Sequence, residues 1–416
     1  MDRAKPYNIP KREVWEAYKT VRANHGAAGV DGQTISDFEA DLENNLYKLW
    51  NRLSSGSYFP PPVRRVDIPK SDGKTRPLGI PTVADRIAQM VVKRHLEPLA
   101  EPKFHPDSYG YRPGKSALDA VGAARQRCWR HDWVLDLDIK AFFDSIETEL
   151  LMRAVRKHTD CPWALLYIDR WLKAPVQMAD GSLVGRESGT PQGGVISPLL
   201  ANLFLHYAFD MWMRRNFPDT PFERYADDAI CHCRTEDQAT ALRTALETRF
   251  ADCGLTLHPK IVYCRDESRR ENHPTFKFDF LGYTFRPRMV SKRAGGMGVS
   301  FSPAASTTAL TAIRRTIRSW SMHRRSNKAL DDLARMFNSH IRGWINYYGR
   351  FCPSALYPTL KHIDLILARW ATGKFKSLRG RKRRSRHWLA RIARHQPRLF
   401  AHWSLLYGSG RTMGAG

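Results

Sequence analysis

Two adjacent aspartates in the middle of the chain constrain its fold more than any other feature. Asp227 and Asp228 interrupt a segment, residues 222–233, that is otherwise rich in apolar residues. Apolar runs on both sides of a short polar step predict two strands joined by a tight turn, with the acids at its tip. Carboxylates that are partly buried beside apolar strands need a cation to neutralise them. The motif therefore predicts a cation-dependent site on a β-hairpin.

A second pair of aspartates shows that adjacency alone is weak evidence. Asp331 and Asp332 open a predicted helix, where acids interact favourably with the helix dipole and need no catalytic role. The apolar surroundings of Asp227 and Asp228 make the difference between the two pairs.

A third carboxylate is available in residues 133–139, which alternate between apolar and polar and predict a strand with Asp136 and Asp138 on one face. This strand could be an edge strand with a wet face. Alternatively, Asp138 joins Asp227 and Asp228 around two Mg²⁺ ions, which favour carboxylate oxygens. Two such ions, about 3.5–4 Å apart, stabilise the attacking and leaving oxygens of an in-line phosphoryl displacement.

The charge balance indicates a polyanionic partner. The 416 residues include 67 Lys and Arg against 41 Asp and Glu, a net charge of +26, with a globular 42% of hydrophobic residues. Such an excess of cations on a folded chain points to nucleic acid first. No apolar run approaches the roughly 18 residues of a membrane span, and the N-terminus lacks the apolar segment of a secretory signal. We therefore expect no membrane association.

Cysteine usage fits a reducing compartment. Seven scattered cysteines do not form a disulfide framework, so we expect a cytoplasmic protein. Cys231 and Cys233 are too closely spaced for a zinc knuckle and are expected to pack in a strand.

The coarse organisation changes from mixed to helical along the chain. No internal repeat is visible, and beyond about residue 300 the strand patterns disappear. Apolar spacing predicts helices over 11–53 (with a turn at 29–32), 84–99, 150–158, 198–214, 238–253, 307–320, 328–349 and 358–371. Strands are predicted at 63–68 and just after a turn at 70–76, at 133–139, in the 222–233 hairpin, at 255–257 and as a pair over 276–285.

The C-terminal stretch is strongly basic. Residues 365–416 contain thirteen Lys and Arg and no acid. A charge run is often only a solvated face, but the aromatic residues among these cations favour phosphate contact with stacking on bases. The densest cations are Arg379, Arg381, Lys382, Arg383, Arg384 and Arg386.

In their order and content, these blocks resemble the group II intron reverse transcriptase–maturases. The matching motifs lie at 66–70 with 76–81, 109–114, 138–144, 189–198, 225–228, 254–260, 280–283 and, in the helical part, 341–348. The resemblance runs from about residue 10 to 400.

The resemblance implies an α+β fold: a right-hand polymerase whose fingers and palm contain antiparallel sheet, followed by an all-helical thumb/maturase domain. The expected domains are an N-terminal helical extension (1–60), fingers and palm (61–295), the helical thumb/maturase domain (296–373) and a basic nucleic-acid-binding segment (374–416).

It also implies roles for individual residues. Asp138, Asp227 and Asp228 match the catalytic, metal-binding aspartates, with the backbone carbonyl of Ile139 as a further ligand; the cofactor is two Mg²⁺ ions, with Mn²⁺ as a substitute. Nucleotide-binding roles fall to five residues. Lys70 and Arg76 hold the triphosphate, Phe143 lies under the sugar and excludes a 2′-hydroxyl, Gln192 contacts the incoming nucleotide, and Lys260 lies near the leaving pyrophosphate.

The expected function is an RNA-directed DNA polymerase that also binds its group II intron RNA to assist splicing and mobility. Its partners would be intron RNA, an RNA template with a DNA primer, target DNA and deoxynucleoside triphosphates; the oligomeric state is left open. No Cys/His-rich HNH-type endonuclease cluster follows, so the chain is expected not to cut its own target and to need a primer from elsewhere. Two alternatives stay open: an intron-less, host-adopted relative in DNA repair or phage defence, and a non-polymerising splicing cofactor.

Overall fold

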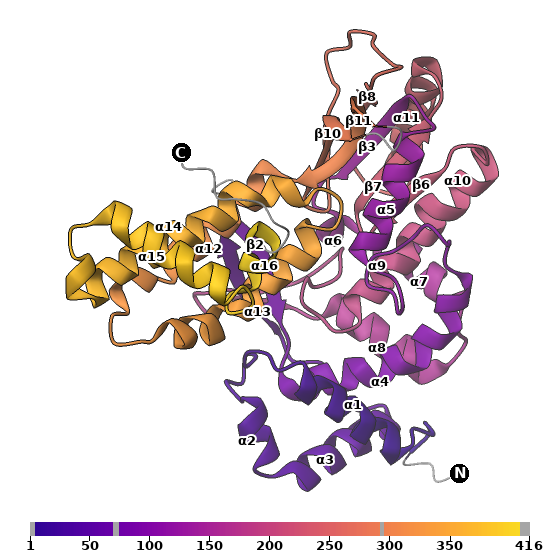
Figure 1. Ribbon diagram of the computed structural model, residues 1–416. Helices are drawn as coiled ribbons and strands as arrows, with labels where there is room; N and C mark the ends of the chain where they lie inside the picture. The colour runs from indigo at the N-terminus through magenta and orange to yellow at the C-terminus, as the bar shows by residue number, and fades with distance from the viewer. Residues whose placement is uncertain (1–4, 70–74, 292–294, 408–416) are drawn as a thin grey trace. The chain divides into compact units, whose positions relative to one another are not determined.

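The computed structural model describes residues 5–69, 75–291 and 295–407 (Figure 1). The chain forms two compact units, one of Met1–Arg127 with Trp133–Ile261 and the other of Cys128–Asp132 with Val262–Gly416. Helices and strands are mixed in the first unit, and the second begins with strands and ends in helices. The expected α+β class is therefore confirmed. No helix within the described residues is long and apolar enough to cross a membrane.

The first unit opens with helices that pack on one another. α1 (Lys11–Ala23) and α3 (Leu42–Ser55) both contact α4 (Val83–Ala100) and each other, and the short α2 (Ile35–Glu39) packs on α3 (Figure 1). The helices predicted within 11–53 are confirmed, with the glycine turn between α1 and α2. The predicted helix over 84–99 is α4.

A four-stranded sheet forms the centre of the first unit, in the order β6-β7-β3-β8. Its strands are β6 (Phe222–Tyr225), β7 (Asp228–Cys233), β3 (Trp133–Ile139) and β8 (Leu257–Tyr263), and helix α11 (Glu236–Asp252) packs on β3 and β7. Cys231 and Cys233 are free and buried in β7, as their strand setting predicts. The strand expected at 255–257 instead begins at Leu257 and runs on as β8.

A second sheet of the first unit has the order β2-β1-β4-β5. β1 (Val63–Pro69) and β2 (Thr75–Ile80) pair in antiparallel register, which confirms the two predicted strands; residues 70–74 of the predicted turn lie outside the described residues. β4 (Val176–Gln177) runs parallel to β1, and β5 (Leu183–Val184) pairs with β4. The other helices of this unit are α5 (Ala117–Cys128), α6 (Phe142–Ser145), α7 (Thr148–Arg156), α8 (Pro162–Lys173), α9 (Ser197–Leu205), α10 (Met211–Asn216) and the 3-10 turn Glu101–Lys103.

The single helix predicted over 198–214 is wrong in one respect. α9 and α10 are separated by a π-helical segment, His206–Asp210. Such wider turns occur mostly as local bulges, frequently at functional sites. This one carries Asp210, whose buried carboxylate is bound by an arginine from β6. The spacing of apolar residues cannot reveal this contact between Asp210 and a residue of another strand.

The second unit contains an antiparallel sheet, β11-β10-β9, followed by helices. Its strands are β9 (Phe278–Phe280), β10 (Tyr283–Ser291) and β11 (Met297–Ala305). The strand pair predicted over 276–285 is confirmed. The expectation that strands end near residue 300 is wrong, because β11 pairs with β10 as far as Ala305.

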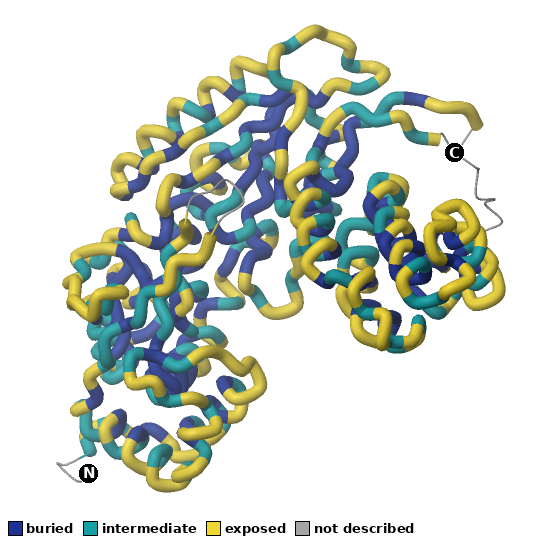
Figure 2. The backbone as a smooth tube through the Cα atoms, turned by 90° about the vertical axis from the view of Figure 1, so that its left-hand side faces the viewer, coloured by how far each residue is buried: buried dark blue, intermediate teal, exposed yellow. Residues whose placement is uncertain are grey.

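Five helices share the hydrophobic core of the second unit: α12 (Thr307–Ser319), α13 (Leu330–Tyr348), α14 (Tyr357–Lys374), α15 (Lys382–His395) and α16 (Ala401–Tyr407). Short 3-10 turns lie at Met322–Arg324, Pro353–Leu356 and Lys376–Leu378. Buried and exposed residues alternate along these helices, as expected where one face is turned to a core (Figure 2). The basic C-terminal stretch is therefore folded as far as Tyr407.

Candidate active site

Strand β3 brings one carboxylate opposite the hairpin. Along β3, Asp136 is half-buried and Asp138 exposed, whereas Leu137 and Ile139 between and after them are buried. This confirms that the two aspartates share a face. Asp138 is the register partner of Asp228 on antiparallel strand β7. Directly opposed residues of such a pair have Cα atoms about 4.5–5.5 Å apart and side chains on the same face.

The third carboxylate lies in the turn of the hairpin. Tyr225 and Asp228 are paired, so Ala226 and Asp227 form a two-residue connection between β6 and β7. Ala226 has φ +56°, a left-handed conformation that a residue with a Cβ adopts only when its surroundings hold it there. Gly110 helps to hold it: a Cβ at Gly110 would lie 2.4 Å from the Ala226 nitrogen. The turn is thus fixed by close backbone packing.

A buried arginine supports the same turn from inside. Arg224 binds Asp210 through two hydrogen bonds, Nε to Oδ1 at 2.7 Å and Nη2 to Oδ2 at 2.6 Å. Its remaining N–H groups donate to the Ala226 carbonyl (3.1 Å), Asn202 Oδ1 (3.0 Å) and Ser108 Oγ (2.8 Å). All five donors of the guanidinium are therefore used.

Electrostatics in this buried cluster favour ionised partners. Burial opposes the charge of Asp210, but Arg224 outweighs it and lowers the pKa of that carboxyl. The buried pair therefore keeps its charge and anchors the residue that precedes the carboxylate hairpin turn. The sequence reasoning missed Arg224; an arginine within the predicted hairpin strand was the available signal.

The environment of Asp227 fits a divalent cation. Burial raises the pKa of Asp227, the neighbouring charge of Asp138 raises it further, and Arg76 opposes both. Concentrated negative charge at a half-buried carboxylate is relieved by a bound cation. The donors are hard oxygens, which suit Mg²⁺.

The carboxylates do not form a preformed cage. Within the described residues, no group of three or more His, Cys, Asp or Glu side chains is placed to hold a metal ion. Mg²⁺ is usually bound through one or two carboxylates together with waters and substrate phosphates. Asp138, Asp227 and Asp228 would supply carboxylate oxygens of this kind.

Two of the expected nucleotide-binding residues are joined directly. Arg76, on β2, donates from Nε to Gln192 Oε1 at 2.6 Å; Arg76 is exposed and Gln192 half-buried. The backbone reinforces this link: Gly79 N donates to the Gln192 carbonyl at 2.6 Å. The charge of Arg76 also lowers the pKa of Asp227. β2 and the glycine-rich loop thus present a cation beside the carboxylates.

The loop that carries Gln192 is held by a second network that the sequence reasoning missed. Gln89 Oε1 accepts from Val195 N at 2.7 Å, and Gln89 Nε2 donates to Asp85 Oδ2 at 3.0 Å. Tyr58 Oη and Trp171 Nε1 donate to Asp85 Oδ1 at 2.8 and 2.7 Å. Burial raises the pKa of Asp85 to about 6 against these hydrogen bonds. Asp85 fixes which end of the Gln89 amide faces the loop.

The remaining residues expected at the site are Phe143, Ile139, Lys260 and Lys70. Phe143 is buried in α6, where its ring contacts Phe142 and its carbonyl accepts from Thr190 N at 2.8 Å. Ile139 is the buried last residue of β3, and Lys260 is exposed on β8. Lys70 lies outside the described residues.

The six cations of the C-terminal stretch lie in the second unit. Arg379, Arg381, Lys382, Arg383, Arg384 and Arg386 are all exposed, and no salt bridge of theirs is found among the described residues. The opposite face of α15 packs inward: Ser385 Oγ donates to the Ala368 carbonyl at 2.7 Å, and Leu389 is buried. Four of the cations therefore lie in the first turns of an ordered helix, α15, and Arg379 and Arg381 lie just before it.

Comparison with known proteins agrees with this site. Residues 68–285 match the model of the reverse transcriptase (RNA-dependent DNA polymerase) family, and residues 310–388 match the group II intron, maturase-specific domain. The chain therefore belongs to the reverse transcriptases, in the group that carries the maturase-specific domain of group II introns. The matched regions contain the carboxylate hairpin and most of the C-terminal helices.

Individual relatives align with about half of the chain. Protein YkfC of Escherichia coli (strain K12) is 38% identical over 209 residues, covering 49% of this chain and 54% of YkfC. Group II intron-encoded protein LtrA of Lactococcus lactis subsp. cremoris is 37% identical over 194 residues, which cover 46% of this chain and 32% of LtrA. An uncharacterized 91 kDa protein in the cob intron of Schizosaccharomyces pombe is 31% identical over 192 residues, which cover 46% of this chain and 23% of that protein. Each match thus spans about half or less of the relative's length.

Proposed function

We propose that this chain is an RNA-directed DNA polymerase that also binds group II intron RNA to assist splicing and mobility. The observation that carries the proposal is the register of β3 and β7, which sets Asp138 opposite Asp228 with Asp227 in the adjoining turn. Its substrates would be an RNA template, a DNA primer or target, and deoxynucleoside triphosphates, and its expected compartment is the cytoplasm.

In this proposal, Asp138, Asp227 and Asp228, with the Ile139 carbonyl, hold two Mg²⁺ ions. When bound, these ions supply charge stabilisation for the attacking and leaving oxygens of an in-line phosphoryl displacement. Burial raises the pKa of Asp227, and a cation bound beside it would favour its carboxylate form. The buried Arg224–Asp210 pair supports the turn that carries Asp227 and leads into Asp228.

The nucleotide would be held by residues around the carboxylates. Arg76, oriented by Gln192, places a guanidinium where it can pair with the triphosphate. Lys70 and Lys260 would add charge on the triphosphate and the leaving pyrophosphate. Phe143 would close the space beneath the sugar and exclude a 2′-hydroxyl. Gln89 and Asp85 act through the loop and are positioning residues.

The RNA-binding part of the proposal rests on α15. Six exposed cations, four in the first turns of α15 and two just before it, suit phosphate oxygens better than a flexible charge run would. Because this helix shares its core with the maturase-matching helices, RNA recognition would be a property of the folded unit.

The test is primer extension with the purified chain on an RNA template annealed to a DNA primer, with and without Mg²⁺. We expect extension that needs the metal and stops after addition of a chelator. A chain that binds RNA but extends no primer would point to the splicing-cofactor alternative. To separate an intron-associated from a host-adopted role, the flanking DNA is inspected for a surrounding group II ribozyme.

A further inference from the structure

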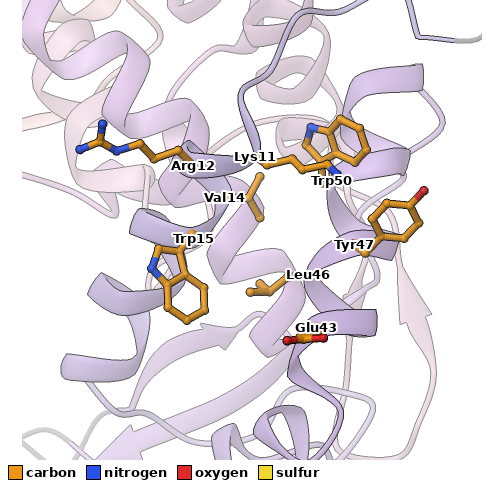
Figure 3. A pocket seen from close by; sticks show the side chains of 8 residues that line it. All are labelled: Lys11, Arg12, Val14, Trp15, Glu43, Leu46, Tyr47 and Trp50. Carbon is orange, nitrogen blue, oxygen red and sulfur yellow. The ribbon is translucent and has the colours of Figure 1, made fainter.

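A pocket on the N-terminal helices lies outside the residues assigned to catalysis. α1 and α3 enclose a volume of about 430 Å³, within the range of about 300–1,000 Å³ typical of small-ligand sites. Val14 and Leu46 lie between Trp15 on one side and Tyr47 on the other (Figure 3). The result is an apolar slot with an aromatic ring at each side.

Both flanking rings are unusually accessible. Trp15 is 44% exposed and Tyr47 52%, although both lie on helices with well-buried inner faces. Trp50, at the edge of the same pocket, is instead tied down: its Nε1 donates to the Ile9 carbonyl at 2.7 Å. Each ring also has a neighbour within the fold: Trp15 contacts Tyr18 at 5.5 Å between ring centroids, and Lys11 Nζ lies 5.3 Å from the centre of the Tyr47 ring. The exposed parts of Trp15 and Tyr47 still offer aromatic surface at the two sides of the slot.

The pocket has a positive side. The Nζ atoms of Lys5 and Lys11 lie 4.0 and 4.6 Å from the centre of the Trp50 ring. The pKa of the Tyr47 phenol is lowered, first by a hydrogen bond with Asn51 and then by the charge of Lys5. These effects indicate a positive potential beside the slot.

Of the nearby acids, two on α1 are paired with other cations and one, Glu43, lines the slot itself. Glu13 and Glu16 of α1 are engaged, by Arg94 at 2.9 Å and Lys19 at 2.8 Å. Within the described residues, neither Lys11 nor Arg12 forms a salt bridge. Glu43 lies at the end of the slot away from Lys11 (Figure 3). The slot thus has a cationic end and an anionic end.

We propose that this pocket receives one unpaired nucleobase of a bound RNA. Aromatic faces beside cations are the chemistry by which proteins hold single-stranded nucleic acid, because any base can stack while its phosphates meet the cations. Glu43 repels phosphate, so the RNA backbone passes on the side of Lys5 and Lys11. This inference rests on the proposed function in that RNA is the ligand; it adds a site remote from the carboxylates.

The test compares RNA affinity of full-length variants with that of the parent. Trp15→Ala and Tyr47→Ala should each weaken binding of a fluorescently labelled, unstructured RNA 12-mer by about 5- to 150-fold, the usual loss of one base–aromatic stack. Tyr47→Phe keeps the ring and should bind like the parent. Phe276→Ala removes an aromatic ring that is 40% exposed elsewhere in the chain and should also leave affinity unchanged.

Two further readouts separate this site from the palm. Extension of a pre-annealed primer at saturating protein should be the same in Trp15→Ala as in the parent. Photo-crosslinking of the same RNA carrying 4-thiouridine should label peptides within residues 11–50. If the parent binds no RNA, the proposed function fails. If the parent binds RNA but Trp15→Ala and Tyr47→Ala bind equally well, the pocket proposal is overturned and a protein ligand takes its place.

Discussion

Asp138 and Asp228 occupy directly opposed positions on the antiparallel strands β3 and β7. Residues 90 positions apart in the chain are thereby held on one face by backbone hydrogen bonds, with Asp227 in the adjoining turn. The separation between these carboxylates depends on the ladder and not on the conformation of a loop. Substitutions at these positions therefore test the site directly.

Asp227→Ala and Asp228→Ala should each reduce DNA synthesis by roughly a thousandfold or more, since losing an anionic ligand removes several kcal/mol of charge stabilisation. RNA binding should persist, because its cations lie elsewhere. The measurement is single-turnover primer extension beside RNA affinity. Asp331→Ala, in the exposed helix-opening pair, is the matched control and should behave like the parent. Substantial synthesis by either hairpin variant would show that the catalytic centre lies elsewhere.

Arg224→Lys should destabilise the first unit by about 2–5 kcal/mol, because an ammonium replaces five fixed donors with three and leaves buried acceptors unpaired. Urea unfolding measures the loss. Under conditions in which Arg224→Lys is still folded, its maximal rate of DNA synthesis should also fall, because the Ala226 carbonyl loses its hydrogen-bond donor. Arg214→Lys, at an exposed position, should change neither quantity. Full stability in Arg224→Lys would mean that this network does not support the turn.

Asp85 should make stability depend on pH. Its pKa is raised from 3.8 to about 6 in the folded chain, so the folded state binds the proton more tightly than the unfolded state. The stability that this group contributes is full below pH 3.8 and is lost as the pH rises through about 6. The difference in unfolding free energy between the parent and Asp85→Asn should thus fall by on the order of 2–3 kcal/mol between acidic and neutral pH.

Urea unfolding of both proteins at several pH values measures this difference. In Asp85→Asn an amide would face the Gln89 amide, so the KM for nucleotide should rise as the 190–197 loop loses its support. A flat difference for Asp85→Asn would place its titration outside this range.

Phe143→Ala should raise ribonucleotide incorporation relative to deoxyribonucleotide, since removing the ring opens space beneath the sugar while the aspartates stay in place. Single-nucleotide kinetics on an RNA template measure the ratio of kcat/KM for the two sugars. Phe142→Ala, the neighbouring buried ring, controls for loss of packing. An unchanged ratio would give Phe143 the role of a core aromatic only.

Changing Arg381, Arg383, Arg384 and Arg386 to Gln should weaken RNA binding and flatten its salt dependence. Each phosphate contact contributes roughly 0.7–0.9 to the slope of log K against log salt, so four contacts account for about three units. Titrations at several salt concentrations measure the slope. Extension of a pre-annealed template at saturating protein should change far less. Parallel slopes would locate the RNA contacts elsewhere, in the other helices of the second unit or on α1–α3.

The parts of the fold that follow from local patterns could be predicted from sequence. Alternation identified β3 and the shared face of Asp136 and Asp138, and apolar spacing identified helices such as α4 and α12. The Arg76–Gln192 contact joins two residues that family resemblance had already grouped. These features depend on residues close in sequence or on a shared motif.

The missed features depend on distant partners. Arg224 meets Ser108 across 116 positions, and Gln89 meets Val195 across 106. No periodicity marks a buried polar residue whose donors come from elsewhere in the chain. The π-helical segment at His206–Asp210 escaped for the same reason, because its apolar pattern is that of an ordinary helix.

The packing of α15 has a consequence for how tightly RNA would be bound. A cationic tail that orders only on contact loses conformational entropy at that moment, which weakens binding for a given number of contacts. Here Ser385 and Leu389 fix the helix on the protein before any ligand arrives. The loss of conformational entropy on ordering this helix therefore occurs during folding and does not weaken RNA binding. The charges are held at fixed spacings, and these spacings can discriminate between RNA shapes.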